Sequence, residues 1–282
     1  MKTPQNSLIA GGVIVGFLLL AYLLATEHIS QSLLLGIGLL LGYTLFHARL
    51  SFTGAFRRMM SVGNGQAMRS HMLMLTVAVT LFAPILAYGV TFFGSPVAGY
   101  ISPVGISLVV SAFMFGIGMQ HGSGCASGTL YAIGGGRSVV FVTLGLFVVG
   151  STIGAYHLPF WTEEMPAFAP FCLATSTGLG YGGAWLVSIV FFGLVARIML
   201  VIEKKKKAPK MAPIPTEKGW KRIFRGSWPM FAAAIILAVL NALTLMTRGE
   251  PWGILALAGT FLALYLRPLF GLSVPKSSDS VC

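Results

Sequence analysis

The segment GMQHGSGCASGTLYAIGGG, residues 118–136, places a thiol and several hydroxyls among closely spaced glycines, directly after an apolar run. Cys125 is a soft, weak hydrogen-bond donor, whereas Ser123, Ser127 and Thr129 are harder donors. Together they suit an oxyanion that also carries sulfur. A second interpretation stays open, in which the glycines only let helices approach closely and the cysteine packs as a small apolar residue.

Enzyme chemistry is not predicted for this segment. We expect the Cys125 thiol to act as a neutral donor, because a thiolate in a dry pathway repels an anion, and it has no base partner in the sequence that would make it a nucleophile. His121 has no second histidine or carboxylate near it in the sequence, which argues against a metal site. No nucleotide-phosphate loop or CxxC motif is present. The sequence therefore predicts no catalytic residue, no metal and no cofactor.

Composition indicates an all-α integral membrane protein. The chain has 282 residues, of which 56% are hydrophobic and only 9% are charged. Apolar runs of about twenty residues each fit a hydrocarbon core of about 30 Å. They predict a helical bundle of about eight spans, the first of them a retained helix, at 8–26, 31–48, 71–94, 101–119, 138–157, 176–201, 228–247 and 252–271.

The basic residues follow the positive-inside pattern of a multi-pass protein with both termini in the cytoplasm. In an eight-span arrangement, one side holds Arg49, Arg57, Arg58, Arg69, Arg137 and the cluster within 204–225, and the other side holds Arg248 alone. The net charge of +12 is explained by topology and by contact with anionic lipid. Nucleic acid is not a predicted partner, since no nucleic-acid motif or soluble domain accompanies these residues.

One polar segment divides the chain. Its lysines and prolines mark residues 203–226 as a basic cytoplasmic linker. We expect a six-span unit at 1–202 before it, a two-span unit at 227–272 after it, and a polar tail at 273–282. The spans contain no Asp or Glu for a proton relay, which favours passive or partner-assisted uptake over pumping.

Two segments predict short re-entrant or broken helices, around 49–60 and around 120–136. In the second, five glycines are too closely set for a comfortable helix, since each costs about 1 kcal/mol relative to alanine. They are Gly116, Gly118, Gly122, Gly124 and Gly128. A short helix restarting near Ser127 or Thr129 would point its N-terminal amides at the break, as in transporter sites for anions.

These two segments carry a family resemblance. ARLSFTGAFRRM, residues 48–59, followed by PVGISLVVSAFMFGIGMQHGSGCASGTLYAIGGG, residues 103–136, resembles the YeeE/YedE sulfur-transport family, which includes bacterial inner-membrane thiosulfate permeases. The resemblance implies an hourglass-shaped bundle of two inverted repeats, whose re-entrant helices meet near the midplane. It also implies that thiols pass thiosulfate or a related sulfur or selenium species along a narrow conduit.

By position, the resemblance assigns Cys125 as the family's pathway cysteine, flanked by Gly124 and Gly128. Arg57 and Arg58 fall at its basic position, which would form the entrance. Many family members have a cysteine where this chain has Thr53, so one relay thiol becomes a hydroxyl.

The resemblance also implies that the second repeat begins near residue 227, and we expect most of that repeat to be missing. Three accounts stay open: an inactive relative, a chain that pairs with a second copy or another membrane subunit, and a family fold without transport. A cytoplasmic sulfur carrier is a further possible partner. Cys172 is expected to serve packing, and Cys282 lies on the polar tail.

Overall fold

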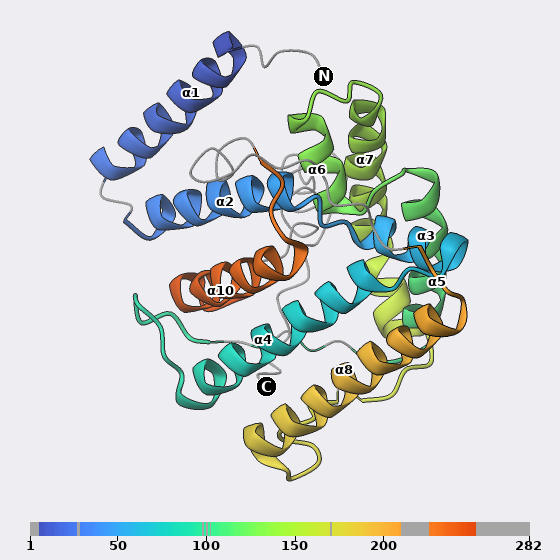
Figure 1. Ribbon diagram of the computed structural model, residues 1–282. Coiled ribbons are helices and arrows are strands. Elements are labelled where there is room, and N and C mark those ends of the chain that lie inside the picture. Colours follow the sequence, from blue (N-terminus) through green and yellow to red (C-terminus); the bar gives the residue numbers. More distant parts are fainter. Residues whose placement is uncertain are drawn as a thin grey trace.

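The computed structural model describes residues 6–26, 29–97, 99, 101, 103–169, 171–209 and 226–251 (Figure 1). Within these ranges the protein is built from helices, with one isolated antiparallel bridge between Gly105 and Ala167. The helices are α1 (Asn6–Ala25), α2 (Ile29–Ala48), α3 (Phe52–Val62), α4 (Gln66–Tyr88), α5 (Ile106–His121), α6 (Ala126–Gly134), α7 (Val140–Pro159), the π-helical turn η1 (Phe160–Glu164), α8 (Gly180–Lys205) and α10 (Met230–Arg248).

The predicted class, a polytopic helical membrane protein, is confirmed. Among the described residues, five helical stretches are long and apolar enough to cross a membrane: Ile29–Val62, Gln66–Tyr88, Ile106–Gly134, Gly180–Lys205 and Met230–Arg248. Gly11–Ala25 and Val140–Gly154 are shorter apolar helices. The eighth predicted span, 252–271, lies outside the described residues, as do the tail and most of the linker.

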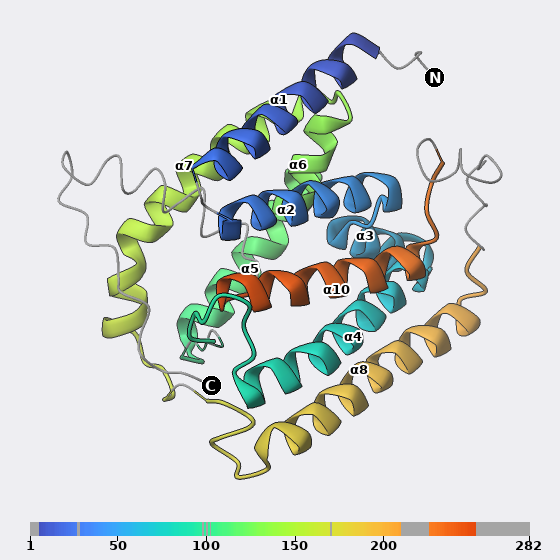
Figure 2. The same cartoon turned by 90° about the vertical axis from the view of Figure 1, so that its left-hand side faces the viewer.

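Helices α2, α10, α4 and α8 pack side by side in that order (Figures 1 and 2), and the first three of them contain much of the buried core. Helix α10 lies between α2 and α4 and has more buried residues than any other helix in the described ranges. Ala233 and Leu237 of α10 pack with Leu41 of α2, while Leu245 packs near Ile85 of α4. The segment after the linker therefore completes the core of the segment before it.

The outer helices carry apolar side chains on their exposed faces. No residue of α5, α7 or α8 with a described burial is buried, although these helices are rich in Phe, Val and Leu. Lipid tails are as apolar as these side chains, so a bilayer favours such surfaces where water would not. The pattern agrees with the membrane class.

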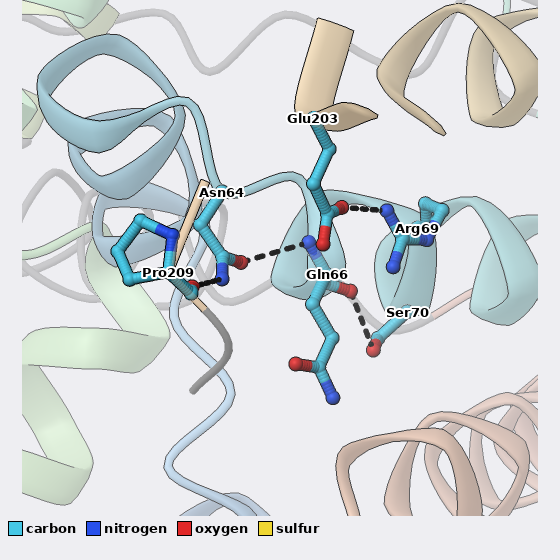
Figure 3. A network of polar contacts seen from close by, with 6 residues as sticks. All are labelled: Asn64, Gln66, Arg69, Ser70, Glu203 and Pro209. Carbon is cyan, nitrogen blue, oxygen red and sulfur yellow. Dashed lines mark hydrogen bonds and ion pairs between the residues drawn. The ribbon is translucent and has the colours of Figure 1, made fainter. Parts of the chain in front are cut away.

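A polar network holds the turn between α3 and α4 against the end of α8 (Figure 3). The buried Asn64 side chain donates to the carbonyl of Pro209 at 2.9 Å and accepts from the backbone N–H of Gln66 at 3.1 Å. Arg69 pairs with Glu203. Gly63 is left-handed, with φ of 74°, and a Cβ there would lie 2.7 Å from Lys206. The network fixes the position of α3 from its C-terminal side.

Candidate functional site

The first helix break separates α2 from α3, within the segment expected to be broken. Helix α2 ends at Ala48, and Arg49 then takes a left-handed φ of 48°, which is uncommon for a residue with a side chain. Ser51 caps α3, because its hydroxyl accepts the backbone N–H of Gly54 at 3.3 Å. The chain thus turns sharply and restarts as a helix of eleven residues.

The second break lies between α5 and α6. Helix α5 continues through Gly116 and Gly118 as far as His121, so only residues 122–125 interrupt the helix. Here too a residue with a side chain is left-handed, Ser123 with φ of 58°. Helix α6 starts at Ala126, within a few residues of the expected restart. Strained backbone of this kind costs about 1–3 kcal/mol and tends to mark functional sites.

Cys125 is the N-cap residue of α6, and its side chain makes no capping hydrogen bond. Its thiol is free, is partly buried and lies 3.4 Å from the Ser127 hydroxyl. The amides of the first helical turn precede the internal hydrogen-bond ladder, which begins with the Thr129 N–H bonded to the Cys125 carbonyl at 2.8 Å. This helix end therefore presents N–H groups beside the thiol.

The two breaks contact each other. A Cβ on Gly128 would lie 3.4 Å from the Cys125 sulfur and 3.5 Å from the Ser51 hydroxyl oxygen. Because this glycine has no side chain, the start of α6 can lie close to the start of α3. Arg57 adds a second link, because its guanidinium donates to the carbonyl of Gln120 at 3.2 Å.

A cavity of about 190 Å³ lies where the breaks meet. Its lining contains three arginines and no acidic residue, so the site has a positive electrostatic character. The two left-handed residues from the breaks both line it. The lining residues are Arg49, Leu50, Ser51, Thr53, Gly54, Arg57, Arg58, Ala67, Ser123, Tyr131 and Met230.

Thr53 is the most unusual member of this lining. It is 1% exposed, and among the described residues its hydroxyl oxygen is the buried side-chain polar atom that has no hydrogen-bond partner. Leaving such a group unsatisfied costs about 1–3 kcal/mol. The residue lies in the first turn of α3, two positions before Ala55, which belongs to a buried cluster with Ala67 and Met68.

Four of the residues predicted for the site line the cavity: Thr53, Arg57, Arg58 and Ser123. The other five lie at the second break and the first turn of α6, beside the cavity lining and not part of it: Gly124, Cys125, Ser127, Gly128 and Thr129. Gly124 packs closely on Thr129, since a Cβ there would lie 3.2 Å from its backbone nitrogen. Cys172 does not line the cavity; it is a buried, disulfide-bonded residue in the segment between η1 and α8.

Seven lining residues were not predicted as site residues, among them Arg49, Tyr131 and Met230. Arg49 had a signal, since it directly follows a helix end and precedes the capping serine. Tyr131 and Met230 had none, because Met230 reaches the cavity only through the packing of α10. No group of three or more metal-ligating His, Cys, Asp or Glu side chains is found in the part of the chain that the structure describes.

Comparison with known families identifies the family of the chain. The family model described as "Sulphur transport" matches residues 47–275, a range that starts just before the first break and includes both breaks. The chain belongs to the sulphur-transport family. The family predicted from the motifs at residues 48–59 and 103–136 is thereby confirmed.

Relatives within the family include named transporters. The chain is 29% identical over 213 residues to the probable transporter YedE of Escherichia coli, covering 73% of this chain and 50% of that relative. It is 26% identical over 211 residues to the thiosulfate transporter TsuA of Escherichia coli, covering 73% and 57%. For TsuA of Spirochaeta thermophila the identity is 24%, with coverages of 56% and 50%. The chain spans about half the length of these relatives.

Proposed function

We propose that the protein is a permease of the bacterial inner membrane for thiosulfate or a related small sulfur or selenium species. The proposal rests on family membership and on the name of TsuA, which is a thiosulfate transporter. The observation that carries it is the arginine-lined cavity at the junction of the two helix breaks, with the free Cys125 thiol beside it. A positive cavity attracts an anion, and the thiol can donate to a sulfur atom.

In the proposed arrangement α3 and α6 are re-entrant helices, and α1, α2, α4, α5, α7, α8 and α10 cross the membrane with the segment 252–271 as the eighth span. Broken backbone at membrane depth is tolerated where a cavity or a solute satisfies its polar groups. Supporting this, the basic residues Arg49, Arg57 and Arg69 and the end of α8 gather at one end of the bundle. That end would face the cytoplasm, with both termini on the same side.

A second candidate function follows from the length of the match, since the chain spans only about half the length of its relatives. In it, the protein is a membrane subunit or an inactive relative that does not transport alone. A second copy or another subunit would then complete the conduit, and a cytoplasmic carrier would receive the sulfur species.

Growth on thiosulfate as the sole sulfur source separates these functions. A bacterium lacking thiosulfate uptake would express the wild-type chain, Cys125→Ala, or the control Cys172→Ala, at matched membrane levels. We expect growth with the wild type and the control, and none with Cys125→Ala, because Cys125 lies beside the cavity and Cys172 does not. No growth with a correctly folded wild type would contradict transport by this chain alone and favour the subunit.

A further inference from the structure

We propose that the first helix break is a binding subsite for the oxygen atoms of a tetrahedral oxyanion, with the Thr53 hydroxyl as its central donor. This inference rests on the proposed function, because it assumes that the protein is a permease. It concerns the oxygen atoms of the ligand, whereas the proposed role of Cys125 concerns its sulfur. It makes the site accept anions that carry no sulfane sulfur, with sulfate as the test ligand. The argument starts from the unpartnered hydroxyl in the cavity wall.

Several threonine hydroxyls in the other described helices bond to a carbonyl of their own helix. Thr44 in α2 donates to the carbonyl of Leu40 at 2.7 Å, and Thr244 in α10 donates to that of Leu240 at 3.0 Å. In both bonds the acceptor is the carbonyl four residues earlier, a common partner for a threonine hydroxyl inside a membrane helix.

The Thr53 hydroxyl cannot make the corresponding bond. The residue four positions earlier is Arg49, which precedes α3 and has a left-handed backbone, so its carbonyl is not part of the helix ladder. The hydroxyl is consequently left without a partner in the wall of a cavity. A ligand in the cavity supplies the missing partner.

The groups around this hydroxyl select for an anion. Thr53 is the second residue of α3, where the positive end of the helix dipole and the first amides lie. Arg49 and Arg57 line the same cavity, and each guanidinium has five N–H donors, of which the bond from Arg57 to Gln120 uses one. Guanidinium groups match the oxygen pairs of tetrahedral anions.

The size of the cavity fits the same ligand class. About 190 Å³ holds one small tetrahedral anion with a few waters, since each water takes about 30 Å³ in the liquid. A thiosulfate in this subsite would turn its oxygens toward Thr53 and the arginines. The sulfane sulfur would then face the second break and Cys125.

Binding to the purified full-length protein in nanodiscs tests the subsite. Equilibrium dialysis with radiolabelled sulfate and with radiolabelled thiosulfate would compare the wild type with Thr53→Val, which keeps the shape but removes the hydroxyl, and with Thr53→Ser, which keeps the hydroxyl. Thr44→Val is the matched control, because it removes a buried hydroxyl that bonds only to its own helix. Near-identical thermal unfolding would show that all variants are folded.

We expect sulfate to bind the wild type, Thr53→Ser and Thr44→Val alike, and to bind Thr53→Val at least about tenfold more weakly. Sulfate binding that is equal in Thr53→Val and Thr44→Val, or absent from the wild type, overturns the subsite. Thiosulfate uptake measured in the same preparation is the separate test of the permease. Thiosulfate uptake without sulfate binding would contradict the proposed subsite alone. Sulfate binding without thiosulfate uptake would support the subsite and contradict the proposed permease.

Discussion

At the first break, between α2 and α3, the groups that face the cavity are guanidinium ions and hydroxyls, from Arg49, Arg57 and Thr53. The second break, between α5 and α6, contributes the Ser123 hydroxyl to the lining, and the Cys125 thiol lies beside that lining. Both breaks contain a left-handed residue that is not glycine, and each precedes a short helix. Two similar helix breaks thus present hard donors on one side and a soft donor on the other. This arrangement suits an anion that has oxygen atoms at one end and a sulfur atom at the other.

The breaks also differ in how they are held. Helix α3 is fixed by its Ser51 cap, by the packing of Ala55 on α4, and by the Asn64 network at its far end (Figure 3). Helix α6 has no side-chain cap and packs mainly against α2 and α7. The two sides therefore differ in the kind of support, with a side-chain cap and a polar network at α3 and helix packing at α6.

Reversing a charge at the first break is expected to have the largest effect. Arg57→Glu places a negative charge in the cavity and removes the bond to the Gln120 carbonyl. We expect thiosulfate uptake by whole cells to fall at least tenfold, because like charge excludes the anion. Arg57→Lys keeps the charge but loses the planar fork, so it should retain part of the uptake. Uptake unchanged by Arg57→Glu would mean that the cavity does not lie on the pathway.

A smaller effect is expected at the second break. In Gly124→Ala the new methyl group would lie 3.2 Å from the Thr129 backbone nitrogen, so the first turn of α6 has to shift. We expect uptake to fall severalfold while the protein stays folded, as judged by size-exclusion chromatography. Gly118→Ala is the matched control, because its methyl group would meet nothing within 4 Å and alanine favours a helix. Equal uptake in both variants would show that the position of α6 is unimportant.

Hydropathy and glycine spacing in the sequence were enough to predict the class, most helix positions and both breaks. They succeed because a bilayer imposes span length and because clustered glycines disfavour a helix. The same signals placed the second break too broadly, since α5 tolerates Gly116 and Gly118. Each of these two glycines weakens the helix by about 1 kcal/mol relative to alanine, which is not enough by itself to end it.

The composition of the cavity was only partly predictable. Thr53, Arg57, Arg58 and Ser123 could be named from motifs, because they belong to the two unusual segments. The position of α10 between α2 and α4 could not, since it depends on packing between residues almost two hundred positions apart. Neither could the left-handed backbone of Arg49, which has no signature in side-chain chemistry.

The central claim is that the two breaks share one ligand, and protection of the Cys125 thiol tests it most directly. The rate of N-ethylmaleimide reaction at Cys125 would be followed by mass spectrometry of its peptide, with sulfate or with chloride at equal ionic strength. We predict that sulfate slows the reaction in the wild type and has no such effect in Thr53→Val, because the anion held at the first break covers the second. Equal rates in sulfate and chloride, in a wild type shown to bind sulfate, would contradict a shared site.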